Sequence, residues 1–172
     1  GGGDFTVLTS LDYCNGVYRV REIEKKDLRD TMQIVGLIVR KHKENRYHQI
    51  NVDDTGIGGG VTDRLKELGL NVFGFDAGSS PINSWAQSTC ANLKAEHYVL
   101  AKKLFEKDQL RIIPNDDLLE ELGSIKTKFE SDGKLRILKP EKSPDHVDSL
   151  VIGLYRGHGR WMVLSDEKGV IF

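Results

Sequence analysis

The stretch YHQINVDDTGIGGGVTDRLKELGLNVFGF, residues 47–75, contains the pattern that decides the fold. It begins with a short strand candidate at 47–52, passes through DDTGIGGG, and continues with helical spacing in VTDRLKEL up to Gly69, which is placed as a helix-ending glycine. A second strand candidate follows at 71–75. Strand, helix and strand in this order form a βαβ unit, whose strands lie parallel and adjacent. We therefore expect an α/β domain.

The segments that precede this unit extend the predicted sheet. Residues 5–11 and 17–23 are rich in β-branched and apolar residues, and DYCNG between them supplies turn residues, so we expect an antiparallel hairpin. Residues 28–43 have helical spacing, with acidic residues early and basic residues late. A hairpin combined with a βαβ unit predicts a central mixed β-sheet flanked by α-helices.

The segments that follow add helices and a second hairpin. A helix is expected over 92–107, and another through LLEELGSIKTKF, residues 118–129. A hairpin-like element follows at 134–138, and SPDHVDSLVIGLYRG then predicts an amphipathic helix, with Ser143 as its cap and Pro144 at its first position. The last stretch has a strand-like WMVL, but its role is not readable from the sequence.

Composition restricts the classes of protein that the chain can belong to. The chain has 172 residues, 38% hydrophobic and 30% charged, which is typical of one globular domain. No apolar run is long enough to span a membrane, and no secretory signal is present, so we expect a soluble, intracellular protein. Its two cysteines have no zinc-binding spacing. The net charge of -1 gives no global attraction to nucleic acid.

Two acidic pairs are candidates for chemistry. Asp53 and Asp54 end a strand, and Asp145 and Asp148 lie at i and i+3 in the first turn of a helix, facing the same way. Carboxylates are the ligands that Mg²⁺ and Mn²⁺ prefer, and two-metal hydrolysis of a phosphodiester needs at least three of them. The alternative is that one pair belongs to a turn and the other only stabilises a helix N-terminus.

The glycines of DDTGIGGG let the backbone approach a ligand or phosphate closely, or they only form a tight strand-to-helix turn. The run does not match the Walker A pattern, so we expect no ATP hydrolysis. His146 lies between the two aspartates of the late helix. We expect it to be an exposed helical histidine rather than a metal ligand.

Basic residues gather in several places, and each group either faces solvent or contacts DNA phosphates. Lys139 and Lys142 immediately precede the acidic helix, and Lys94 begins an earlier helix. We treat these three lysines as the candidates for DNA binding.

Four segments together resemble the C-terminal nuclease domain of tailed-phage large terminases, a branch of the ribonuclease H-like superfamily that also includes RuvC-type resolvases. The segments are GGDFTVLT, VDDTGIGGGVTDRL, ANLKAE and SPDHVDSLVIGLY, and the resemblance covers roughly residues 1–156. It implies a ribonuclease H-like fold and places the metal ligands at Asp53, Asp145 and Asp148. Asp54 is the fallback if the strand register differs by one residue, because neighbouring strand residues face opposite sides.

The resemblance also implies a first strand, with the family's first catalytic aspartate, upstream of the Gly-Gly-Asp segment. The chain begins inside that segment, so we expect residues 1–172 to be a single nuclease domain that lacks this strand, with Asp4 as a second fallback ligand and 157–172 as a C-terminal extension.

The function that the resemblance implies is a metal-dependent endonuclease that holds two Mg²⁺ or Mn²⁺ ions and cuts concatemeric double-stranded DNA during packaging. The implied partners are a packaging ATPase domain N-terminal to this region, a small terminase subunit and the portal, in the cytoplasm of the bacterial host. Two alternatives stay open. One is a RuvC-like resolvase of branched DNA, and the other is a catalytically silent module that docks to DNA or the portal.

Overall fold

The computed structural model describes residues 5–56, 58–155 and 167–171. The elements in chain order are β1 (Thr6–Cys14), β2 (Val17–Lys26), α1 (Thr31–Asn45), β3 (Gln49–Asp53), α2 (Gly58–Glu67), β4 (Val72–Phe75), α3 (Ser84–Gln87), α4 (Leu93–Glu106), β5 (Leu110–Arg111), α5 (Asp116–Ser124), β6 (Thr127–Phe129), β7 (Leu135–Ile137), α6 (Asp145–Gly153) and β8 (Glu167–Ile171).

A six-stranded mixed sheet runs through the molecule in the order β4-β3-β8-β1-β2-β5. β3 and β4 are parallel, with Asp53 opposite Phe75, and α2 connects them, which confirms the βαβ unit expected from the sequence. β1 and β2 form the expected antiparallel hairpin, which turns at Asn15 and Gly16, both in the left-handed region. The fold class is therefore the predicted one.

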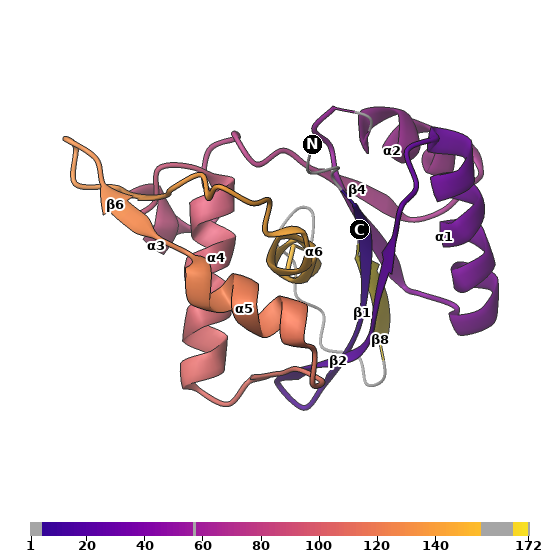
Figure 1. The fold of residues 1–172 in the computed structure, drawn as a ribbon, viewed down its shortest axis with the longest axis horizontal. Helices are drawn as coiled ribbons and strands as arrows, with labels where there is room; N and C mark the ends of the chain where they lie inside the picture. Colours follow the sequence, from indigo (N-terminus) through magenta and orange to yellow (C-terminus); the bar gives the residue numbers. More distant parts are fainter. Residues whose placement is uncertain (1–4, 57, 156–166, 172) are drawn as a thin grey trace.

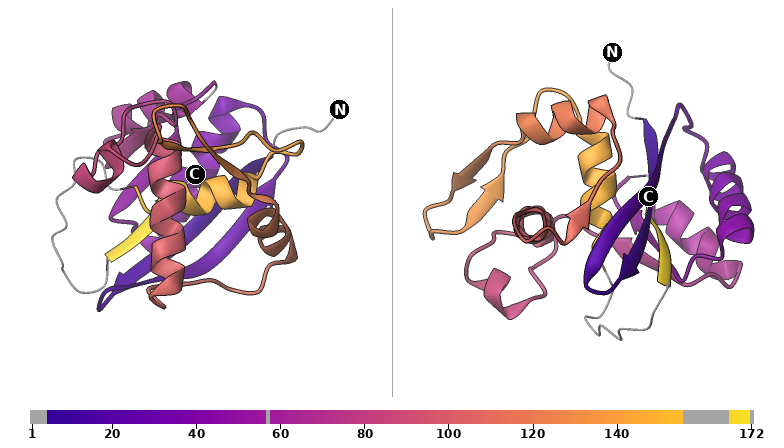
Figure 2. Two further views of the ribbon diagram at one scale, coloured as in Figure 1. Left: turned by 90° about the vertical axis from the view of Figure 1, so that its left-hand side faces the viewer. Right: turned by 90° about the horizontal axis from the view of Figure 1, so that it is seen from below.

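The sheet lies between two helical layers (Figures 1 and 2). α1 and α2 cover one face, where they enclose Leu8, Ile50 and Val52 in one apolar cluster. α4, α5 and α6 lie on the other face over a second cluster that includes Leu11 of β1. Leu8 and Leu11 face opposite sides of the sheet because they are three residues apart, and the side chains of a strand alternate between its two faces.

β8 occupies an inner position of the sheet. Its backbone pairs antiparallel with β1 and parallel with β3, so it joins the hairpin to the βαβ unit. The sequence predicted a strand in WMVL, but residues 161–164 lie outside the described residues, and the strand that is described runs over 167–171. The expectation of a further strand upstream of residue 1 stays a prediction.

Two expected boundaries are wrong. The helix expected to extend to Phe129 ends at Ser124, because Ile125 adopts an extended conformation and Thr127–Phe129 pairs with Leu135–Ile137. This β6–β7 hairpin projects beyond α4 and α5 at the left of Figure 1. α6 begins at Asp145 with Pro144 as its N-cap, so Pro144 is not in the first helical turn and Ser143 is not the cap.

None of the helices in the described part of the chain has both the length and the apolar character that a membrane span requires.

Candidate metal centre

Asp53 ends β3, where it is held by the turn that follows. The backbone N–H and the hydroxyl of Thr55 donate to its Oδ1 at 3.1 and 2.7 Å. At Gly58 the chain passes back against the end of the strand, and an added Cβ would lie 1.6 Å from the Asp53 carbonyl oxygen. The glycine run therefore includes one position where the close approach of two backbone segments requires glycine.

Asp54 points away from this turn. Its carboxylate lies against Gly74 of β4, where an added Cβ would come within 2.9 Å of both carboxylate oxygens. Asp54 is exposed, and it does not line the cavity that Asp53 lines. Of the two neighbouring aspartates, the strand thus directs Asp53 toward the cavity.

Asp148 lies in the first turn of α6, and two side chains of α4 hold it. The ammonium Nζ of Lys94 is 2.8 Å from Oδ1 and 3.0 Å from Oδ2, and the Tyr98 hydroxyl donates to Oδ1 at 2.6 Å. Burial of the Tyr98 hydroxyl, reinforced by the Asp148 carboxylate, raises the pKa of the phenol well above its ordinary value. Tyr98 therefore keeps its proton and acts as a donor to Asp148 at neutral pH.

Asp145 begins α6 and is tied to the start of β1, because the backbone N–H of Phe5 donates to its Oδ2 at 3.3 Å. Asp4, the other fallback ligand, lies outside the described residues.

The three predicted ligands Asp53, Asp145 and Asp148 line one cavity of about 670 Å³. They reach it from the ends of two elements that are far apart in sequence, β3 and α6. Over residues 5–56, 58–155 and 167–171, however, no three His, Cys, Asp or Glu side chains stand close enough together to surround a single ion. The oxygen donors suit a divalent cation, and they face a common space without converging on one point.

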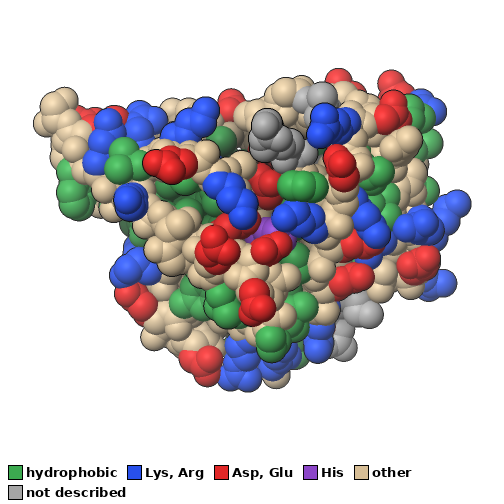
Figure 3. All heavy atoms as spheres, in the orientation of Figure 1, with side chains coloured by type: hydrophobic (Ala, Val, Ile, Leu, Met, Phe, Trp, Pro, Cys, Tyr) green, Lys and Arg blue, Asp and Glu red, His purple; other side chains and the backbone are tan. Residues whose placement is uncertain are grey.

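A second cavity of about 730 Å³ adjoins the first and shares Asp145 and Asp148 with it. All three lysines proposed for DNA binding, Lys94, Lys139 and Lys142, line this second cavity. Figure 3 shows basic and acidic side chains interleaved in the middle of this face, where Figure 1 places α6. A hollow with carboxylates at one end and ammonium groups beside them suits a phosphate-bearing ligand with bound cations.

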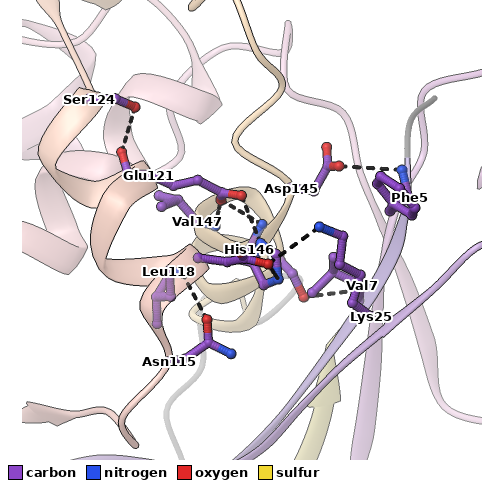
Figure 4. A network of polar contacts seen from close by, with 12 residues as sticks. Phe5, Val7, Lys25, Asn115, Leu118, Glu121, Ser124, Asp145, His146 and Val147 are labelled. Atoms are coloured by element: carbon purple, nitrogen blue, oxygen red, sulfur yellow. Dashed lines mark hydrogen bonds and ion pairs between the residues drawn. The ribbon is translucent and has the colours of Figure 1, made fainter. Parts of the chain in front are cut away.

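The expectation for His146 is wrong. The residue is 2% exposed, and Glu121 of α5 binds its Nδ1 at 2.7 Å (Figure 4). The sequence also gave no indication of Glu121, which lies 25 residues earlier. Tyr98 was missed as well, although it lies four residues after Lys94 on a predicted helix, and that spacing places both side chains on one face.

Comparison with known proteins identifies the fold. No protein-family model and no curated protein sequence matches the chain. Among solved structures, the K428A nuclease domain of the large terminase subunit gp2 of bacterial virus Sf6, with manganese and beta-thujaplicinol, is similar with a TM-score of 0.72 and 21% identity, covering 88% of this chain and 82% of that one.

Two further structures agree with it. The same Sf6 domain with manganese alone gives a TM-score of 0.67 at 19% identity, over 86% of this chain and 87% of that one. The large terminase nuclease of the thermophilic phage G20c with bound magnesium gives 0.65 at 18% identity, over 88% and 74%. The chain therefore has the ribonuclease H-like fold of terminase nuclease domains.

Proposed function

We propose that this chain is the nuclease domain of a phage large terminase, a Mg²⁺- or Mn²⁺-dependent endodeoxyribonuclease that cuts concatemeric double-stranded DNA during genome packaging. The observation that carries the proposal is that Asp53, Asp145 and Asp148 line one cavity. The fold shared with terminase nucleases that were solved with manganese or magnesium supports it.

In this proposal Asp53, Asp145 and Asp148 would hold two divalent ions. Such ions activate water and neutralise charge on the phosphate. Thr55 fixes the orientation of Asp53 through two hydrogen bonds to one carboxylate oxygen, which leaves the other oxygen available as a ligand. Asp148 is oriented from α4, where the Tyr98 hydroxyl holds its Oδ1 and the Lys94 ammonium contacts both of its carboxylate oxygens.

Lys139, Lys142 and Lys94 would contact the DNA backbone beside the acidic residues. They line the cavity that adjoins the aspartates, so a strand whose phosphate reaches the carboxylates would also pass these ammonium groups. Contacts of this kind position DNA without reading its sequence. We accordingly expect cleavage with little sequence preference.

In the complete protein, the domain would follow a packaging ATPase domain and act with a small terminase subunit and a portal in the cytoplasm of the host cell. These partners and this location are part of the proposal.

Asparagine substitutions test the proposed function, because they remove the charge of a ligand and keep its shape. We expect Asp53→Asn, Asp145→Asn and Asp148→Asn each to slow Mn²⁺-dependent cleavage of supercoiled plasmid at least about a hundredfold, since a lost ligand removes several kcal/mol of transition-state stabilisation. Asp54→Asn is the matched control, and it should cleave like the wild type. Unchanged cleavage by Asp53→Asn and Asp148→Asn would contradict the proposal.

Two further measurements separate the alternatives. A strong preference for four-way junctions over linear duplex would favour a RuvC-like resolvase. A folded chain that binds no Mn²⁺ in calorimetry would favour a silent docking module.

A further inference from the structure

The first turn of α6 lacks a cap from its own sequence. The first N–H groups of a helix have no partner within the helix. Pro144, the N-cap residue, makes no side-chain hydrogen bond to this turn, and its carbonyl accepts only from the N–H of Asp148, at 2.8 Å. The N–H groups of His146 and Val147 therefore need an acceptor from another part of the chain.

Glu121 of α5 is that acceptor. Its Oε2 accepts from the N–H of His146 at 2.8 Å and from the N–H of Val147 at 3.0 Å. Only 9% of the Glu121 side chain is exposed, so these bonds are shielded from water. A carboxylate at this end of a helix is stabilised by the helix dipole as well as by the hydrogen bonds.

The second oxygen of Glu121 binds the side chain of the same turn. Its Oε1 lies 2.7 Å from Nδ1 of His146, so both oxygens of Glu121 contact the same turn. Figure 4 shows Glu121 reaching from α5 to the end of α6, with His146 pointing toward it. The Glu121 carboxylate thus binds His146 and Val147, the two residues that lie between Asp145 and Asp148.

A chain of contacts continues from this turn to the start of β1. Nε2 of His146 is 3.6 Å from Asp117, which also binds Lys25 at 3.4 Å. The Lys25 ammonium lies 4.3 Å from the centre of the Phe5 ring, and the N–H of Phe5 donates to Asp145. The first turn of α6 is therefore held on the side of α5 and on the side of the sheet.

We propose that Glu121 is a positioning residue of the metal centre: its carboxylate caps α6 from α5 and so fixes the turn that presents Asp145 and Asp148 to the cavity. This inference rests on the proposed function. Burying a carboxylate is costly unless it is hydrogen-bonded, whereas an apolar side chain here would leave the N–H groups of His146 and Val147 without an acceptor. What Glu121 provides beyond packing is a fixed position for two backbone N–H groups. Groups that orient metal ligands affect metal affinity strongly even though they do not touch the ion.

Glu96 provides a matched control. It is another buried carboxylate, and it also accepts two backbone N–H groups, from Ile82 and Asn83, and the side-chain amide of Asn83. Its hydrogen bonds hold the loop before α3 and do not involve α6. Glu121→Ala and Glu96→Ala therefore remove equivalent groups at different places, and Glu121→Gln keeps one acceptor oxygen for the helix.

The first measurement is amide hydrogen exchange without metal or DNA. In Glu121→Ala, the amides of His146 and Val147 should exchange about tenfold faster or more, because each loses a hydrogen bond to a charged group. Glu121→Gln should fall between this variant and the wild type. Glu96→Ala should leave these two amides unchanged while the amides of Ile82 and Asn83 exchange faster.

The second measurement is the affinity for Mn²⁺ by calorimetry. We expect the dissociation constant to rise about 10- to 100-fold in Glu121→Ala, to recover in part in Glu121→Gln, and to stay near the wild-type value in Glu96→Ala. If Glu121→Ala does not fold, Glu121→Gln and Glu96→Gln take the place of the alanine pair.

The inference is overturned if the Glu121 variant exchanges the amides of His146 and Val147 at the wild-type rate, or if it binds Mn²⁺ with wild-type affinity. It is also overturned if the Glu96 variant loses as much Mn²⁺ affinity as the Glu121 variant. The proposed function fails in a different way, namely if Asp148→Asn still cleaves DNA.

Discussion

At the scale of single residues, Gly58 leaves no room for a side chain beside the end of β3. A Cβ there would lie 1.6 Å from the carbonyl oxygen of Asp53 and 2.8 Å from its carbonyl carbon, and both are backbone atoms that cannot turn aside. Gly58→Ala must therefore move the end of β3 or the start of α2. We expect the free energy of unfolding to fall by about 2 to 4 kcal/mol, measured by urea denaturation.

Gly60 in the same helix is the control for this prediction. Its nearest neighbour would be the Thr31 methyl carbon, 3.7 Å from an added Cβ, which is an ordinary contact. Alanine also favours the helix by up to about 1 kcal/mol relative to glycine, so Gly60→Ala should be neutral or stabilising. If both variants were equally stable, the close approach at Gly58 would not constrain the chain as described.

The sequence could indicate the aspartates of the site but not the groups that hold them. Asp145 and Asp148 share a face because of helical spacing, and strand alternation separates Asp53 from Asp54; both are local patterns. Burial of His146 depends on which helix packs against it, and Glu121 comes from another helix. No local pattern predicts such a contact.

At the scale of elements, a buried lysine joins the first helix to the hairpin. Lys41 of α1 has a side chain that is 9% exposed, and its ammonium binds Glu22 at 2.9 Å and Glu24 at 2.6 Å, both on β2. Hydrogen bonds to Lys41, and then to Lys26, lower the pKa of Glu24. Burial acts to lower the pKa of Lys41, but the hydrogen bonds to Glu24 and Glu22 outweigh it and raise the pKa.

These shifts predict how stability depends on pH. Because the folded pKa of Glu24 is lower than its ordinary value of 4.5, its contribution is present above that pH and is lost as the pH falls through the folded pKa. The raised pKa of Lys41 gives the opposite sign, so its contribution is lost only in strongly alkaline solution, above its ordinary value of 10.5.

Lys41→Met should reduce the loss of unfolding free energy on acidification. Urea denaturation at a series of pH values from neutral down to pH 3 measures this dependence. An identical acid slope in both proteins would show that this ion pair is not its source.

The elements themselves were predicted best where the pattern was periodic and local. The βαβ unit and the first hairpin follow from alternation, helical spacing and turn residues close together in sequence. The end of α5 was misplaced because LLEELGSIKTKF continues to suit a helix, whereas the pairing of Thr127–Phe129 with β7 decides its second half. Pairing with another segment overrode the local preference.

At the scale of the whole molecule, the order of the sheet could not be derived from the sequence. β8 lies between β1 and β3, although it is separated from both by more than a hundred residues. A short strand of this kind has no periodic signal that would specify its neighbours. The resemblance to terminase nucleases gave the fold class through four separate segments, and similarity to solved structures confirms it at the level of fold.

Because the net charge of the chain is only -1, binding of DNA must depend on where the basic residues lie. Lys139 and Lys142 line the cavity beside Asp145 and Asp148. If both contact phosphates, the double variant Lys139→Gln/Lys142→Gln should weaken binding of any duplex and reduce the slope of log affinity against log salt by about 2. Fluorescence anisotropy with a labelled duplex, in Ca²⁺ to prevent cleavage, measures this slope.

The double variant Lys43→Gln/Lys66→Gln is the control. It removes two exposed lysines from the helical layer on the other face of the sheet and should leave the slope unchanged. Equal slopes in the two double variants would mean that the duplex does not contact the cavity that Lys139 and Lys142 line.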